Sequence, residues 1–167
     1  MPEKATVERA RQAKRAGKSP TTQAGEFVRE EIHHVREGKH GARSAKQAIA
    51  IGLSKARRSG VKLPPPPASA TEGTKQSAKS ASRAAGLSRK TSSRRSRATR
   101  QALKREPKVA ASPQALARQA KSAARRRPAS ARKASARKAA STKGPQVRRQ
   151  AARKAARTRQ RRRRTPA

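Results

Sequence analysis

The chain has 167 residues and carries 47 Lys and Arg against 8 Asp and Glu, a formal net charge of +39. A chain this basic is typical of a protein that binds a polyanion such as nucleic acid. It has no Cys, which excludes disulfides, cysteine–zinc sites and thiol chemistry. No stretch approaches the roughly 20 apolar residues of a membrane span. The first residues lack the apolar segment of a signal peptide, so we expect a cytoplasmic protein without a membrane partner.

Few side chains are available for a hydrophobic core. The hydrophobic residues, 31% of the chain, comprise 36 Ala and only 16 Val, Ile, Leu, Met and Phe. Full burial of a Leu or Val side chain contributes roughly 1.5–3 kcal/mol. Ordering one residue costs about as much in conformational entropy. Most of the chain is therefore predicted not to fold on its own.

Charge divides the chain at a run of four prolines, residues 64–67. Residues 1–63 carry 15 basic and six acidic residues, whereas residues 64–167 carry 32 basic and two acidic residues. Consecutive prolines form a stiff, extended spacer. We therefore predict a small helical module at 1–63, a polyproline linker at 64–67 and a basic tail at 68–167.

The module begins with two predicted helices. Residues 4–16 contain good helix formers but little to bury, so this first helix is expected to be marginal. Ser19 and Pro20 are typical of a helix start, and Gly38 is typical of a helix end. Between them, apolar residues recur at helical spacing and form one stripe: Ala24, Phe27, Val28, Ile32 and Val35.

A third helix is predicted from Ser44, which forms an S-x-x-Q capping box with Gln47. Gly60 is placed to end this helix. Its apolar stripe is predicted to be Ala45, Ile49, Leu53 and Ala56. Ile51 lies off the stripe, which suggests a second apolar contact. A homodimer through this module is therefore one possibility. Two helices joined by a short loop favour a helical hairpin or a helix-turn-helix-like fold.

The tail is of low complexity, and the string A-R-K-A occurs at 131–134, 136–139 and 152–155. High charge with few large apolar residues is typical of disorder. Residues 112–113 and 144–145 nevertheless resemble helix starts, and we expect helix there once phosphates remove the repulsion between basic side chains. The predicted fold class is thus a small all-α module of two to three short helices, followed by a long disordered basic tail with helix-prone segments.

The segment from Ser44 to Arg58 resembles a string shared by an uncharacterised family of small basic bacterial proteins. Their string reads approximately (S/T)-R-K-Q-A-I-A-I-(A/G)-L-S-x-A-R, and Ala45 stands here in place of the usual Arg. The resemblance implies a bacterial origin and no particular chemistry. The tail separately resembles linker-histone tails and the Ala/Lys/Pro tails of bacterial histone-like proteins. It departs from them in holding 30 Arg to 17 Lys across the whole chain, which favours protamine-like condensation.

Two polar groupings contain residue types that are common in chemical sites. His33, His34 and His40 with Glu37 have the spacing of a metal site, but adjacent histidines point to different sides of a helix. We therefore favour a solvated or phosphate-facing role, with no metal and no cofactor. Glu30 and Glu31 lack a partner nucleophile, so they are expected to offset nearby basic side chains, including Arg29 and Arg36, rather than to catalyse. We expect no enzyme.

Clusters of Lys and Arg are the predicted functional residues, since each phosphate contact releases a counterion and Arg binds phosphate oxygens bidentately. Nothing in them specifies a base sequence. The expected function is therefore sequence-tolerant binding and compaction of DNA in a bacterial nucleoid. The alternatives are an RNA- or ribosome-associated protein and a sequence-specific helix-turn-helix regulator. The predicted contact residues are Arg57, Arg58, Arg94, Arg95, Arg97, Arg125, Arg126, Arg127, Arg132, Lys133, Arg137, Lys138, Arg148, Arg149, Arg153, Lys154, Arg161, Arg162, Arg163 and Arg164.

Overall fold

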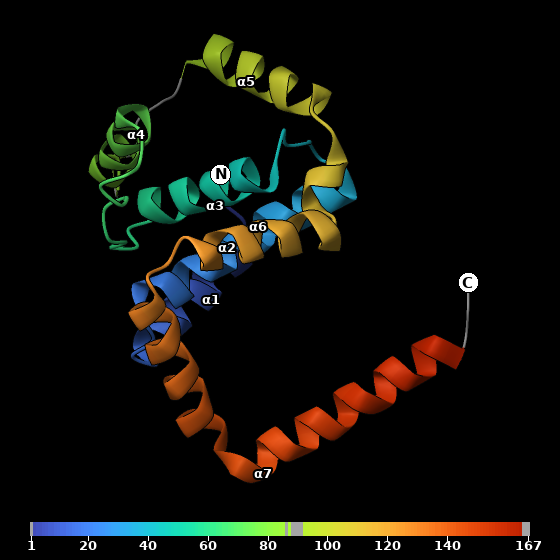
Figure 1. Cartoon of the computed structure of the whole chain (residues 1–167). Helices are drawn as coiled ribbons and strands as arrows, with labels where there is room; N and C mark the ends of the chain where they lie inside the picture. Colours follow the sequence, from blue (N-terminus) through green and yellow to red (C-terminus); the bar gives the residue numbers. More distant parts are fainter. Residues whose placement is uncertain (1, 86, 88–91, 165–167) are drawn as a thin grey trace. The chain divides into compact units, whose positions relative to one another are not determined.

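The computed structural model of the chain describes residues 2–85, 87 and 92–164, without the side chains of residues 143 and 162–164. These residues form two compact units, 1–119 and 120–167, which are described separately. The helical segments within the described residues, drawn in Figure 1, are α1 (Lys4–Arg15), α2 (Pro20–Glu37), α3 (Ala45–Arg58), α4 (Glu72–Arg83), α5 (Ser93–Arg105), the 3-10 helix η1 (Lys108–Ala111), α6 (Pro113–Arg125) and α7 (Ala129–Arg164).

The ends of α2 and α3 confirm the predicted caps. The Ser19 hydroxyl accepts a hydrogen bond from the backbone N–H of Thr22, and Gly38 ends α2 in the left-handed region at φ 78°. At α3, the Ser44 hydroxyl accepts from the Gln47 N–H at 3.3 Å, and the Gln47 side chain accepts from the backbone N–H of the residue before Ser44. These bonds satisfy backbone donors that a helix start leaves free.

The core of the first unit lies between α1, α2 and α3. The apolar stripe of α2 is buried as predicted, except that Val28 is half-buried. Phe27 from α2 packs in one cluster with Ala10 from α1 and Ala56 from α3, with Leu53 at its margin. A hydrophobic core thus forms mainly from Ala and a few larger side chains.

On α3 the buried face is displaced from the predicted stripe. Ile49 and Leu53 are half-buried, whereas Ala48 and Gly52 are buried. A Cβ atom at Gly52 would lie 2.7 Å from the Cα atom of Val28, inside the contact distance of carbon atoms. The absence of a side chain therefore allows α3 to approach the backbone of α2 closely.

The prediction of a disordered tail is wrong. The described residues beyond the prolines form α4, α5, η1, α6 and α7, and those through residue 119 belong to the same compact unit as α1–α3. Hydroxyl caps begin three of these helices, at Thr71, Ser92 and Ser112. Ala, Arg, Lys and Gln have high helix propensity, so caps and propensity outweigh the charge repulsion on which the disorder prediction relied.

Small side chains hold this part of the chain against α2 and α3. Ala110 and Ala111 of η1 are buried in one cluster with Ile32 and Val35 of α2. The backbone N–H of Gly41, in the loop before α3, donates to the carbonyl of the last Leu in α5 at 2.8 Å. Ala therefore contributes more to the hydrophobic core than its small side chain suggested, because an Ala-rich face packs closely against neighbouring helices.

The second unit contains α7, which consists of two helical segments. Gly144 has φ 62° and ψ 166°, outside the helical region, and Pro145 follows it. Figure 1 shows the ribbon of α7 bending sharply along its length. Proline at the first helical position is expected at a helix start, so the predicted start at residues 144–145 is confirmed.

Candidate functional site

The predicted contact residues in the first unit lie at the end of α3 and on α5. Arg57 is half-buried and its Nη2 donates to the carbonyl of Pro64 at 3.0 Å. Arg58 is exposed and its Nε donates to a carbonyl one turn earlier in α3. On α5, by contrast, the predicted residues are all exposed: Arg94, Arg95 and Arg97.

The other predicted contact residues belong to the end of α6, the turn after it, and α7. Those with described side chains are all exposed, namely Arg125, Arg126, Arg127, Arg132, Lys133, Arg137, Lys138, Arg148, Arg149, Arg153, Lys154 and Arg161. The backbone of Arg162, Arg163 and Arg164 is helical, but their side chains lie outside the described residues. The helices therefore display these cations without bringing them into one cleft.

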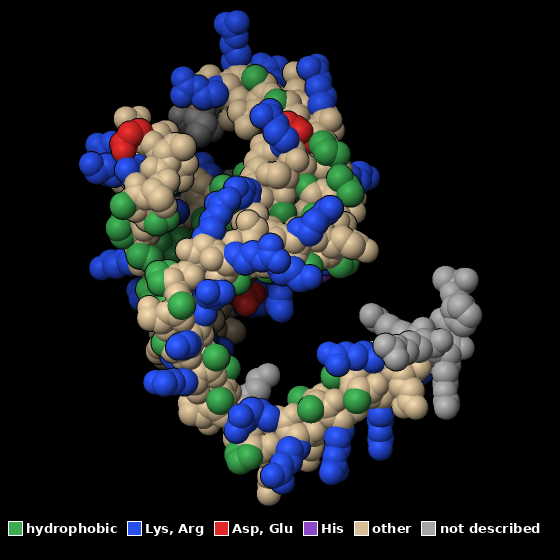
Figure 2. All heavy atoms as spheres, in the orientation of Figure 1, with side chains coloured by type: hydrophobic (Ala, Val, Ile, Leu, Met, Phe, Trp, Pro, Cys, Tyr) green, Lys and Arg blue, Asp and Glu red, His purple; other side chains and the backbone are tan. Residues whose placement is uncertain are grey.

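Few carboxylates can neutralise the basic residues beyond the prolines. Residues 64–167 contain only two acidic side chains, Glu72 and Glu106. Glu72 pairs with Lys75 at 2.7 Å, and Glu106 pairs with Arg43 at 3.6 Å. Figure 2 shows the blue side chains of Lys and Arg on the visible surfaces, with few red carboxylates among them. Thirty-two basic side chains thus share two carboxylates that already have partners.

Two further basic stripes do not stand out as clusters in the sequence, because their members are not adjacent in the chain. On α4, Lys75, Lys79 and Arg83 recur every four residues, while Ala78 and Ala81 of the same helix are buried. On α6, a second stripe has spacings of three and four residues: Arg118, Lys121 and Arg125. Helical periodicity applied to Lys and Arg would have found both stripes.

Residues 1–63 differ from residues 64–167 in this respect. Each of their six acidic side chains pairs with a cationic side chain. Glu30 and Glu31 share Lys55, whose Nζ lies 3.3 Å from Glu30 Oε1 and 2.7 Å from Glu31 Oε2. The expected partners were wrong. Arg29 pairs with another glutamate of α2, and Arg36 donates to a backbone carbonyl in η1.

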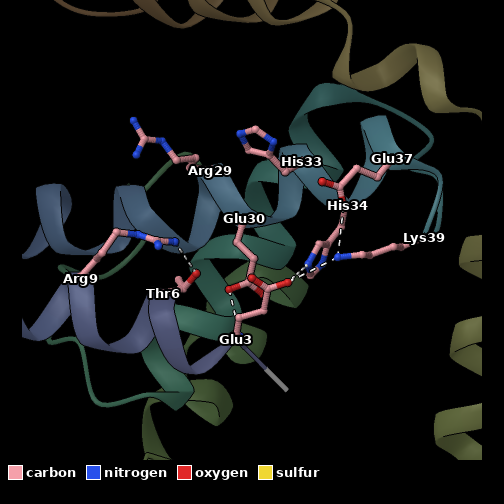
Figure 3. Close-up of a pocket in the computed structure, with 9 residues that line it drawn as sticks. All are labelled: Glu3, Thr6, Arg9, Arg29, Glu30, His33, His34, Glu37 and Lys39. Atoms are coloured by element: carbon pink, nitrogen blue, oxygen red, sulfur yellow. Dashed lines mark hydrogen bonds and ion pairs between the residues drawn. The ribbon is translucent and has the colours of Figure 1, made fainter.

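A pocket of about 290 Å³ lies between α1 and α2 (Figure 3). His34 Nε2 lies 3.0 Å from an oxygen of Glu3, which also accepts a hydrogen bond from Lys39 at 3.4 Å. The hydrogen bond with His34, assisted by Lys39, lowers the pKa of the exposed Glu3 carboxyl below its ordinary value. A hydrogen bond with Glu37 raises the pKa of Lys39. This pocket is thus lined by charges that compensate one another.

The histidines divide between two environments. His33 is exposed, and Figure 3 shows it projecting from α2 away from His34. His34 and His40 instead approach each other edge to face, with ring centroids 6.1 Å apart. Their donor atoms and a carboxylate oxygen of Glu31 all lie within 4.8 Å of one another. The structure therefore brings together a different set from the one weighed in the sequence, with Glu31 in place of His33 and Glu37.

Comparison with known proteins gives one similarity. Residues 11–66 match the model of a family of unknown function, DUF6496. The match extends from within α1 past the end of α3, and it assigns no activity. No curated protein and no solved structure matches the chain. Among the described residues, none of the helices combines the length and apolar character that crossing a membrane requires.

Proposed function

We propose that this protein binds duplex DNA without strong sequence preference and compacts it by neutralising and bridging phosphates, as a nucleoid-associated protein of a bacterium. One observation carries the proposal. Beyond residue 63, 32 Lys and Arg share two acidic residues, both already paired, and the helices expose most of these cations. Such a surface carries an excess of positive charge, which the phosphates of a bound nucleic acid would neutralise.

The arrangement of cations on α7 supports bridging. Successive residues of an α-helix point about 100° apart. In the segment after Pro145, the exposed residues Arg148, Arg149, Arg153 and Lys154 therefore point to several sides of the helix. A helix with cations on several sides is able to contact phosphates of more than one duplex, which is what compaction requires.

The single aromatic residue supports a duplex over a single strand as the partner. Proteins that bind single strands commonly stack bases on exposed aromatic side chains. This chain has one Phe and no Trp or Tyr, and Phe27 is 1% exposed in the core. No exposed aromatic platform is therefore present, and phosphate contacts remain as the source of affinity.

The helix-turn-helix regulator is not favoured. A recognition helix needs a free face that enters the major groove. In such a regulator α3 would be the recognition helix, and it packs against α2, α4 and η1, so that its exposed positions are limited to Lys46, Ala50 and Arg58. Ile51, the residue that suggested a second contact, is half-buried within the single chain, and we do not propose a homodimer.

The test is the salt dependence of DNA binding by the full chain and by a variant. The variant replaces Arg148, Arg149, Arg153 and Lys154 by Gln, which has similar helix propensity. Each phosphate contact contributes about −0.9 to the slope of log affinity against log salt, so up to four lost contacts reduce the slope by about 3–4. Fluorescence anisotropy with a short labelled duplex measures both slopes.

The matched control replaces two uncharged residues of the same segment, Gln146→Ala and Gln150→Ala, and is expected to keep the parent slope. Equal slopes for the parent and the fourfold variant would contradict phosphate binding by α7. Parallel titrations with duplexes of different base composition and with duplex RNA separate the alternatives. A strong preference for one sequence supports the regulator, and tighter binding of RNA at equal salt supports the ribosome-associated protein.

A further inference from the structure

We propose that Glu31, His34 and His40 bind a divalent transition-metal ion, with Zn²⁺ as the ion that suits this donor set. One ligand atom of each side chain lies within 4.8 Å of the others. Two imidazoles and one carboxylate form a common three-residue zinc set, in which water or another group completes the coordination. The proposal is independent of DNA binding and changes the sequence-based expectation of no metal.

The carboxylate of Glu31 is the strongest observation for a ligand. Its side chain is fully buried, and neither oxygen has a hydrogen-bond partner within the described residues. Lys55 and His40 lie within ion-pairing distance, but their contacts do not have hydrogen-bond geometry. A buried carboxylate is costly unless its oxygens are satisfied. A metal ion supplies that missing interaction.

The distances match a coordination sphere. Glu31 Oε1 lies 3.1 Å from His40 Nε2. Metal bonds of about 2.0–2.2 Å arranged tetrahedrally place neighbouring ligand atoms roughly 3.3–3.6 Å apart. Glu31 and His34 stand three residues apart on α2, so both project from one face of a rigid helix. The ligand atom of the third residue, His34, lies within 4.8 Å of the other two.

Neighbouring groups orient each ligand. The Nδ1 atom of His40 donates to the Gly41 carbonyl at 2.9 Å, so the neutral ring carries its lone pair on Nε2, the atom facing Glu31. Glu3 lies 3.0 Å from Nε2 of His34. Lys55 lies 2.7 Å from Oε2 of Glu31 and leaves Oε1 for the metal. Carboxylates and carbonyls in these places are typical partners of metal-binding histidines.

The loop that carries His40 is also held in position. Its next residue, Gly41, donates its N–H to a carbonyl of α5 at 2.8 Å. A Cβ atom at Gly41 would collide with the backbone carbonyl of Glu106. The ion would therefore connect α2 to a loop that is already fixed, and binding would stabilise the folded chain against unfolding.

The first experiment uses the unaltered full chain. The protein contains three histidines, so their ring signals are few enough to follow individually by NMR. Titration with ZnCl₂ is expected to shift the ring signals of His34 and His40 and to saturate at one equivalent, while His33 shifts little. Shifts of all three rings without saturation would show weak surface binding and overturn the proposal.

The second experiment compares variants by isothermal titration with ZnCl₂. His34→Gln and His40→Gln are each expected to weaken binding by roughly 100-fold or more, because each removes a ligand. The matched control is His33→Gln, which alters the neighbouring exposed imidazole and is expected to bind within about twofold of the parent. Equal losses in all three variants would contradict the assigned ligands.

A loss of fold in a variant is separated from a loss of ligand by circular dichroism without metal. Should His40→Gln lower the helical signal, His34→Gln and the NMR titration of the parent chain decide the question alone. Unchanged ring signals at excess Zn²⁺ in the parent chain would overturn the proposal whatever the variants do.

Discussion

The helices before and after the four prolines differ in how their charges are compensated. In α1–α3, each glutamate has a cationic partner, and Lys55 is only 15% exposed where it meets Glu30 and Glu31. In α5–α7, the described basic side chains are exposed, and the one acidic residue in that part of the sequence, Glu106, pairs with Arg43. The same residue types thus serve the fold in one region and remain available to an external polyanion in the other.

The difference follows from burial. A charge taken out of water needs a partner close by, because desolvation costs several kcal/mol per ion. An exposed charge keeps its hydration and contributes about 0–1 kcal/mol to stability, even in an ion pair. Substitution of the half-buried, paired Lys55 should therefore change stability, and substitution of exposed basic residues beyond the prolines should change nucleic-acid affinity. The following predictions test that division, from the largest expected change in stability to the smallest.

Lys55→Met is expected to destabilise the chain most. It leaves Glu30 and Glu31 buried without their shared cation, which costs about 3–5 kcal/mol when one partner of a buried pair is removed. Urea denaturation followed by the helical dichroism signal measures the free energy of unfolding. Lys46→Met is the matched control, because Lys46 is exposed on the same helix, and it is expected to change that free energy by less than about 0.5 kcal/mol. Equal losses of unfolding free energy in the two variants would contradict the expectation that Lys55 stabilises the fold more than the exposed Lys46.

Leu53→Asp is expected to cost about 2–4 kcal/mol, since it places an unpaired carboxylate at the edge of the core. Leu53 packs against the cluster that contains Phe27 and Ala56. Ala50→Asp is the matched control on the exposed side of α3. Thermal unfolding compares the two variants, and a DNA-binding assay at low salt is expected to show retained affinity for both. Complete loss of DNA binding in Leu53→Asp would assign recognition to α1–α3.

Gly52→Ala is expected to destabilise the chain by about 1–2 kcal/mol, because overpacking outweighs the gain in helix propensity. Its new Cβ atom would lie 2.7 Å from Val28 Cα and 3.0 Å from the Phe27 carbonyl oxygen. Gly25→Ala is the opposite control, since nothing lies within 4 Å of its Cβ position on α2. That variant is expected to gain about 0.5–1 kcal/mol. A gain in both variants would show that α2 and α3 are able to separate at little cost.

Local signals predicted the first three helices well. The start and end of α2 follow from Ser19, Pro20 and Gly38, and each residue has the expected role in the structure. The α3 stripe was less accurate, because Gly52 carries no apolar side chain and therefore no periodic signal. Its burial depends on how closely α2 approaches, which is a property of two helices and not of one.

The helical tail and the histidine cluster could not be predicted from local patterns. Disorder was inferred from charge and a lack of large apolar residues, yet Ala110 and Ala111 are buried against a scaffold that lies far away in sequence. Glu31 and Lys55 are likewise 24 positions apart, and they meet only because α2 and α3 pack together. The sequence grouped His34 and His40 with His33 and Glu37, whereas the tertiary fold places Glu31 beside the first two.

The fourfold Gln variant of α7 is expected to have the smallest effect on stability, a change of less than about 0.5 kcal/mol in the free energy of unfolding. Arg148, Arg149, Arg153 and Lys154 are exposed, and Gln keeps the helix propensity, so no packing or buried pair is lost. Removing four like charges also relieves repulsion, which acts toward stability. Urea denaturation of the full chain without DNA measures this quantity, and the slope of affinity against salt measures the phosphate contacts of the same sample. A large loss of stability would mean that these cations hold the helix in place, and the two regions would then no longer differ in the use of their charges.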